Sequence, residues 1–455
     1  MLTPSEIENR YAELEERLLA RLTRLPKITA ELVVGLAILA TLLLRPLWRM
    51  EFPDWSRFFL IQDRYFAGLA LAVFAAAALR IPERFRPGYG WAAMIGAASA
   101  QAWMGAMAWP QSWWGALALP LFSTIAWFIF RFFPAGKFHP AVRGMSLFAA
   151  FTAVSFLVAS SAVATGETRF LRAFWISQPE YAVLTFVLWS WLMKTSENVA
   201  AITILPTNAL GGILWPVGMA TRPENETARY ALWWRGFLNV MLGQLLFAIA
   251  MIGMNFIGSL RPENPFLGSW FTYPFFLLLI IGAINNGIGL VRMFGVPAPD
   301  GTRFVLFSRT PLEVWQRGST YAYELILRFV FIPAYRASRS LLITAGACFV
   351  AVWFNSFLFH EIVVRKFHAW AVPALHSQQF EVTGILVMSF SWVLTWAVFL
   401  LMSSRFWAPR VRLARSGPKI WISVVLTHLC AASVMPLAQH WIAPAIGRLL
   451  TWGPP

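Results

Sequence analysis

A histidine and a glutamate close an otherwise apolar run in the C-terminal half of the chain. His360 and Glu361 follow LLITAGACFVAVWFNSFLF, residues 341–359. Burying a titratable pair at membrane depth is costly, so such a pair is kept where it faces a cavity or a partner. Imidazole accepts and returns a proton near neutral pH, because its unperturbed pKa is about 6.5. The pattern indicates proton transfer at His360, with one open alternative, namely that the pair only marks a helix end in water.

A group of arginines lies upstream, between residues 287 and 335. Its members are Arg292, Arg303, Arg309, Arg317 and Arg328. The guanidinium group is a planar and permanently charged donor that binds phosphate groups. The competing interpretation is that these arginines set membrane topology and contact anionic headgroups. His368 and His376 lack the spacing of a metal site with Glu361, so no metal is predicted.

The elements that must position these residues are strongly apolar. Of the 455 residues, 58% are hydrophobic and 13% are charged, whereas roughly a quarter are charged in a typical globular domain. We therefore predict an all-α fold, a polytopic transmembrane helical protein. The formal charge of +16 is spread between apolar runs, so no nucleic-acid partner is predicted. Cys348 and Cys430 lie in apolar segments and predict no disulfide framework.

About eleven apolar runs have the length needed to cross roughly 30 Å of hydrocarbon. The predicted spans are 28–48, 64–80, 90–108, 112–131, 141–164, 180–194, 236–258, 271–293, 340–359, 380–402 and 420–440. With the N-terminus inside, 27 of the 37 Lys and Arg residues fall in inner segments, so the positive-inside rule predicts a cytoplasmic N-terminus. Arg outnumbers Lys by 32 to 5, which favours a bacterial source and hence a bacterial inner (plasma) membrane.

The chain is predicted to have an N-terminal surface helix in residues 1–27 and a single transmembrane domain in residues 28–455. Residues 4–26 mix Glu and Arg at helical spacings, which is typical of a helix outside the bilayer. Residues 196–219 are apolar but broken by Pro and Gly, which indicates a re-entrant segment. Residues 321–335, YAYELILRFVFIPAY, have the apolar spacing of an amphipathic helix on the inner face.

Residues 287–364 hold an ordered set of short motifs. They are RMFG (292–295), PD (299–300), SRTPLEVWQR (308–317), RFVFIP (328–333) and FHE (359–361). In order and spacing this set resembles the membrane-bound O-acyltransferase family, while the N-terminal half is similar to it only as a string of helices.

The resemblance implies that the transmembrane domain transfers an acyl group from a thioester, usually acyl-CoA, to a hydroxyl group in a membrane tunnel. The family's histidine falls on His360, which implies a general base for the acceptor hydroxyl. Ser319 takes the second polar catalytic position, where the family usually has Asn or His, and Gly318 stands where it has an aromatic residue. The predicted substrate-binding residues are Arg317, Trp315, Arg292 and Asn286. No cofactor is implied, since acyl-CoA is a substrate.

Three functions stay open at this stage. The first is the acyltransferase, with a lipid-like hydroxyl acceptor favoured over a glycan because His360-Glu361 in a Phe-rich helix resembles the lipid-acylating branch of the family. The second is a non-catalytic relative that binds lipid or pigment or scaffolds a complex, favoured by Ser319 and by 24 Trp and 39 Phe residues. The third, a transporter, gains little support because no inverted repeat is visible. The predicted partners are an acyl thioester, a hydroxyl acceptor and membrane lipids.

Overall fold

The computed structural model describes part of the chain. The described residues are 3–48, 73–74, 76–82, 89, 225–260, 263–293, 295, 300, 302, 304–318, 323, 326–353, 382–403, 405 and 418–450. This part is helical and contains no β-strand, as the all-α prediction requires. The predicted spans from 90 to 194 and the predicted re-entrant segment at 196–219 lie outside it.

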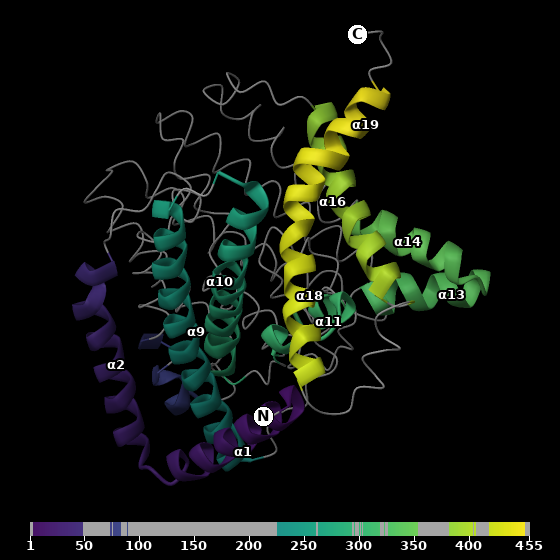
Figure 1. Ribbon diagram of the computed structural model, residues 1–455. Coiled ribbons are helices and arrows are strands. Elements are labelled where there is room, and N and C mark those ends of the chain that lie inside the picture. The colour runs from purple at the N-terminus through teal and green to yellow at the C-terminus, as the bar shows by residue number, and fades with distance from the viewer. Residues whose placement is uncertain are drawn as a thin grey trace, which may run out of the picture.

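The helices of the described part are shown in Figure 1. They are α1 (Pro4–Leu22), α2 (Lys27–Trp48), η2 (Ala78–Arg80), α9 (Glu226–Leu260), α10 (Pro265–Met293), η6 (Val305–Phe307), α11 (Pro311–Gly318), η7 (Leu327–Phe331), α13 (Ile332–Ser338), α14 (Leu341–Trp353), α16 (Val382–Met402), α18 (Pro418–Leu437), η11 (Ala438–Ile442) and α19 (Ala443–Leu450).

Among the described residues, three helical stretches are long and apolar enough to cross a membrane. They are Glu226–Gly258, Pro265–Asn286 and Lys419–Ile446, and they overlap the predicted spans 236–258, 271–293 and 420–440. Leu341–Trp353 and Val393–Met402 are shorter apolar helices within two further predicted spans. These helices make the chain a membrane protein of the helical class.

Helices α9 and α10 begin earlier than the apolar runs predict, because an asparagine caps each of them. The Asn225 side chain accepts from the backbone N–H of Ala228 at 2.8 Å. The Asn264 side chain accepts from the backbone N–H of Phe266 at 2.9 Å, next to Pro265 at the first helical position. Each cap satisfies a donor that the first helical turn leaves unpaired, so the helix can start in a polar segment.

Glycines bring α9 and α10 into close antiparallel contact. A Cβ atom on Gly236 would lie 2.5 Å from the backbone oxygen of Gly289, and one on Gly289 would lie 2.5 Å from that of Gly236. Seven residues along α9, a Cβ on Gly243 would lie 2.7 Å from the oxygen of Gly282. Small residues allow this backbone approach, which favours dispersion contacts between helices in lipid.

Helix α18 joins this pair to the C-terminal helices. Helix α18 packs against α10 and α16, and α14 packs against α16. Helix α1 lies across the lower ends of the upright helices in Figure 1, and it contacts α9. We refer to this end as the α1 end of the bundle.

The predicted inner-face helix at 321–335 is described in its second half. Residues Leu327–Phe331 form a π-helical turn that continues into α13. Arg339 then adopts φ 53°, the left-handed conformation, and its N–H donates to the carbonyl of Tyr335 at 2.8 Å. This turn ends α13 before α14 begins.

Candidate functional site

The six residues predicted to act at the site fall into two groups. His360 and Ser319 lie outside the described residues. Arg317, Trp315, Arg292 and Asn286 are described. The described part of the site therefore consists of the arginine-containing residues between 292 and 318 and of the helices that contact them.

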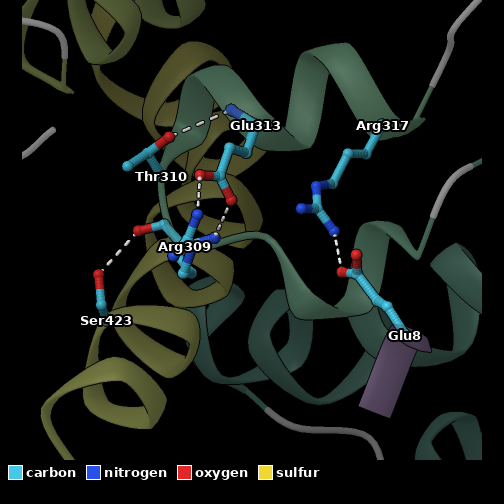
Figure 2. Close-up of polar contacts among 6 residues, drawn as sticks. All are labelled: Glu8, Arg309, Thr310, Glu313, Arg317 and Ser423. Carbon is cyan, nitrogen blue, oxygen red and sulfur yellow. Dashed lines mark hydrogen bonds and ion pairs between the residues drawn. The ribbon is translucent and has the colours of Figure 1, made fainter. Parts of the chain in front are cut away.

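Helix α11 carries the central motif, and its first turn is held by a cap. The hydroxyl of Thr310 accepts from the N–H of Glu313 at 3.2 Å. The carboxylate of Glu313 in turn accepts from the N–H of Arg309 at 2.8 Å and from its guanidinium at 3.3 Å. Ser423 of α18 donates to the Arg309 carbonyl at 2.7 Å, as Figure 2 shows. These bonds fix the start of α11 against α18.

Replacing Thr310 by alanine is expected to loosen α11. The loss of an N-cap hydroxyl costs about 1 kcal/mol, which corresponds to about fivefold faster amide exchange of a helix that opens locally. Hydrogen–deuterium exchange of residues 311–318 measures this change. Thr310→Ser retains the hydroxyl and should exchange as the wild type does. Equal exchange rates in Thr310→Ala and in the wild type would show that the cap does not stabilise α11 against local opening.

Arg317 forms an ion pair that reaches across the chain to the N-terminal helix. Its guanidinium donates to the carboxylate of Glu8 in α1, and both side chains are about three-quarters buried. In Figure 2 the two side chains point toward one another from α11 and α1. Trp315, on the same helix, packs near the ring of Trp396 in α16, with 6.5 Å between the ring centroids. Arg317 and Trp315 therefore connect α11 to two other helices.

Two more contacts hold α1 at this end of the bundle. Glu15 accepts from the Nε of Arg235 in α9 at 2.9 Å. Tyr11 meets Phe304 edge to face, with 5.3 Å between the ring centroids. Helix α1 thus places two carboxylates on arginines of two different elements.

Arg292 lies at the end of α10 and is 4% exposed. Its guanidinium donates to Asp300 at 2.8 Å. The Asn239 amide oxygen, oriented toward α10, accepts from the other terminal nitrogen of Arg292 at 3.0 Å. Gly295 then turns the chain with φ 94°, and its N–H donates to the Arg292 carbonyl at 2.8 Å. The RMFG and PD motifs are joined by this Arg292–Asp300 ion pair.

The two neighbouring asparagines of α10 have different surroundings. The Asn285 amide nitrogen donates to the Ile281 carbonyl at 2.8 Å, and its oxygen lies 3.3 Å from the Asn239 side chain of α9. The Oδ1 atom of Asn286 is buried, and it has no hydrogen-bond partner among the described residues. It lies opposite Gly243, where a Cβ would come within 2.8 Å of it. Asn286 therefore belongs to the helix crossing as well as to the predicted substrate-binding set.

His428 of α18 is a polar residue that the sequence analysis does not single out. Its Nε2 lies 3.0 Å from the Leu306 carbonyl, and because a carbonyl only accepts, Nε2 carries the proton. Its Nδ1 is buried without a partner in the described part of the chain. The ring also lies 5.9 Å from that of Tyr273. The signal was a cluster of polar residues in an apolar helix, Ser423, Thr427 and His428.

The sequence was also compared with known proteins. No protein-family model matches it, and no curated protein is significantly similar to it.

Proposed function

We propose that the chain transfers an acyl group from a thioester donor, acyl-CoA, to a hydroxyl acceptor within a bacterial inner membrane. In this proposal the chain is a membrane-bound O-acyltransferase of about eleven spans with a cytoplasmic N-terminus. The observation that carries the proposal is the ordered motif series from Arg292 to His360. The proposed acceptor is lipid-like, because the His360-Glu361 pair in a Phe-rich segment resembles the lipid-acylating branch of that family.

The described residues support the proposal by their placement. Arg292, Arg309 and Arg317 come from two motif segments, RMFG and SRTPLEVWQR, that lie near the α1 end. The nucleotide part of acyl-CoA carries phosphate groups, which guanidinium groups bind through charge-assisted hydrogen bonds. This arrangement suits a donor that enters from the α1 end.

The proposed chemistry is a proton transfer coupled to acyl transfer. The neutral imidazole of His360 takes the proton from the acceptor hydroxyl, and the resulting oxygen attacks the thioester carbonyl. The C–S bond then breaks, the new ester leaves with the acyl group, and the sulfur receives the proton from His360. Ser319 donates a hydrogen bond to the carbonyl oxygen during the attack.

Thioester consumption by the purified chain tests this function directly. The chain in nanodiscs is offered acyl-CoAs from acetyl to palmitoyl together with mixed lipid alcohols, and free thiol and new ester are both measured. Ester formation in step with thiol release is the expected result. The absence of thiol release across the series would contradict the proposal.

Glu8 is expected to compete with the donor for Arg317. Glu8→Gln removes the carboxylate that holds this guanidinium, and a partly buried ion pair of about 1 kcal/mol corresponds to about a fivefold lower KM for acyl-CoA. The value of kcat should stay the same, because Glu8 does not touch the reacting atoms. Steady-state kinetics at several acyl-CoA concentrations separates the two constants.

Glu13 offers a matched control for that experiment. It lies on the same helix and forms an exposed ion pair with Arg17, with 3.6 Å between the charged atoms. Glu13→Gln removes the same charge and should leave the KM unchanged. Equal KM values in both variants and in the wild type would show that Glu8 does not compete with the donor.

A second function is favoured by two features, one of the sequence and one of the structure. Ser319 replaces the usual Asn or His of the family, and Glu8 already occupies the guanidinium of Arg317. Both suit a non-catalytic relative that binds lipid or pigment or scaffolds a complex. Such a protein would release no thiol from any acyl-CoA and would keep lipid or pigment through purification, which mass spectrometry of the extracted sample detects.

A further inference from the structure

The N-terminal helix α1 presents three distinct faces. One face is turned to the protein and carries Glu8, Glu15 and the buried Leu19. These residues are seven and four positions apart, so they share one line along the helix. The ion pairs of Glu8 and Glu15 prevent the helix from rotating about its axis.

The second face is apolar, with Leu14 and Leu18 exposed and Ile7 half-buried. It carries Ile7, Leu14 and Leu18, which have the same spacing of seven and four. Leu14 is 64% exposed and Leu18 is 40% exposed. At 3.6 residues per turn this line lies roughly a third of a turn from the protein-facing line. An exposed line of large apolar side chains indicates a contact with something other than water.

The third face is basic and borders the apolar one. Arg10, Arg17 and Arg21 repeat the spacing of seven and four, and Arg10 precedes Leu14 by one helical turn. All three are exposed. On this face Arg17 forms an ion pair with Glu13, and an exposed pair of this kind contributes little. Positive charge beside an apolar line is the pattern of a helix that lies in a lipid headgroup layer.

Helix α2 indicates at which depth of the bilayer α1 lies. It begins at Lys27, after the short turn that follows α1, and turns Ile28, Leu32 and Leu36 outward, each more than 60% exposed. An outward apolar line on a helix of 22 residues is typical of a lipid-facing surface. Because this line begins at Ile28, α1 lies at the level of the headgroups.

We propose that α1 docks on the anionic headgroup layer of the chain's own membrane through Leu14 and Leu18 and through Arg10, Arg17 and Arg21. The arginines contact the phosphate groups, and the leucines enter the boundary between headgroups and acyl chains. This inference rests on the membrane placement in the proposed function and does not depend on acyl transfer. Since Glu8 and Glu15 hold the protein-facing line, the helix is bound to the protein along one line and to the lipid surface along the other two.

Spin labels on two sides of α1 test the proposal. Leu14→Cys places a nitroxide on the apolar line, and Glu16→Cys places one on an exposed position about half a turn away, in a chain with Cys348 and Cys430 changed to alanine. The chain is reconstituted in nanodiscs of phosphatidylcholine with 30% phosphatidylglycerol. The label at 14 is expected to be at least threefold less accessible to a water-soluble nickel relaxant than the label at 16. Equal accessibility at both sites would overturn the proposal.

Removal of the basic line tests the role of lipid charge. In the triple variant R10Q/R17Q/R21Q the label at 14 should regain its accessibility to nickel, and nanodiscs of phosphatidylcholine alone should have the same effect on the unchanged arginines. Shielding that persists in both cases would show that the helix meets only zwitterionic lipid or protein, and it would overturn the anionic docking. Both readouts are independent of thioester turnover, so a failed enzyme assay leaves this result intact.

Discussion

Replacing His360 by alanine is expected to reduce acyl transfer by about 10²- to 10⁴-fold, the usual contribution of a positioned general base. Without the imidazole the acceptor hydroxyl keeps its proton and remains a weak nucleophile, while donor binding is unaffected. The loss should therefore appear in kcat, and the KM for acyl-CoA should stay close to the wild-type value. Release of free thiol and formation of ester, measured together, give both constants.

A second histidine provides the control for this experiment. His368→Ala removes an imidazole eight residues further along the chain, outside the motif series. It should retain full turnover. Both variants are first compared with the wild type by thermal unfolding in detergent, so that a folding defect is recognised. A His360→Ala protein that folds normally and keeps its turnover would contradict the assigned role.

Replacing Gly236 by alanine is expected to destabilise the contact between α9 and α10 strongly. The new Cβ would lie 2.5 Å from the Gly289 oxygen and 2.7 Å from the Met293 nitrogen, and both are backbone atoms. Backbone cannot turn away as a side chain can, so α9 and α10 must separate along their whole contact. Overpacking of this kind costs about 1–3 kcal/mol.

Gly346 of α14 is the matched control, because the same change meets open space there. No heavy atom of a described neighbour lies within 4 Å of a Cβ at this position. Alanine in a helix interior is about 1 kcal/mol more favourable than glycine, so Gly346→Ala should stabilise the chain slightly. Unfolding in mixed micelles of increasing SDS fraction compares the two. A Gly236→Ala variant as stable as Gly346→Ala would show that the helices do not approach this closely.

The apolar helices were predictable from the sequence because their signal is local. A run of about 20 apolar residues has one stable arrangement in lipid, in which the helix satisfies its own backbone groups. Helices α9, α10 and α18 therefore lie where the apolar runs predicted them. The ends of these helices were less certain, since Asn225 and Asn264 extend α9 and α10 into polar sequence.

The candidate site was predictable only as a set of residue types. The motif order predicted that Arg292 and Arg317 both bind substrate. It did not indicate which carboxylate each arginine pairs with. Asp300 lies only eight residues from Arg292, so their ion pair could have been predicted from the local sequence. Glu8 lies 309 residues from Arg317, and no pattern along the chain relates the two.

By itself, then, the sequence determined that the apolar runs at 236–258, 271–293 and 420–440 form helices and that a charged helix precedes them near the N-terminus, and it predicted which residues would serve acyl transfer. Only the tertiary structure decided that Glu8 meets Arg317, that Gly236 meets Gly289, and that His428 faces the carbonyl of Leu306. The physical reason is the range of the interactions. Helix formation in lipid depends on neighbours within one turn, whereas ion pairs and helix crossings depend on which distant segments the folded chain brings together.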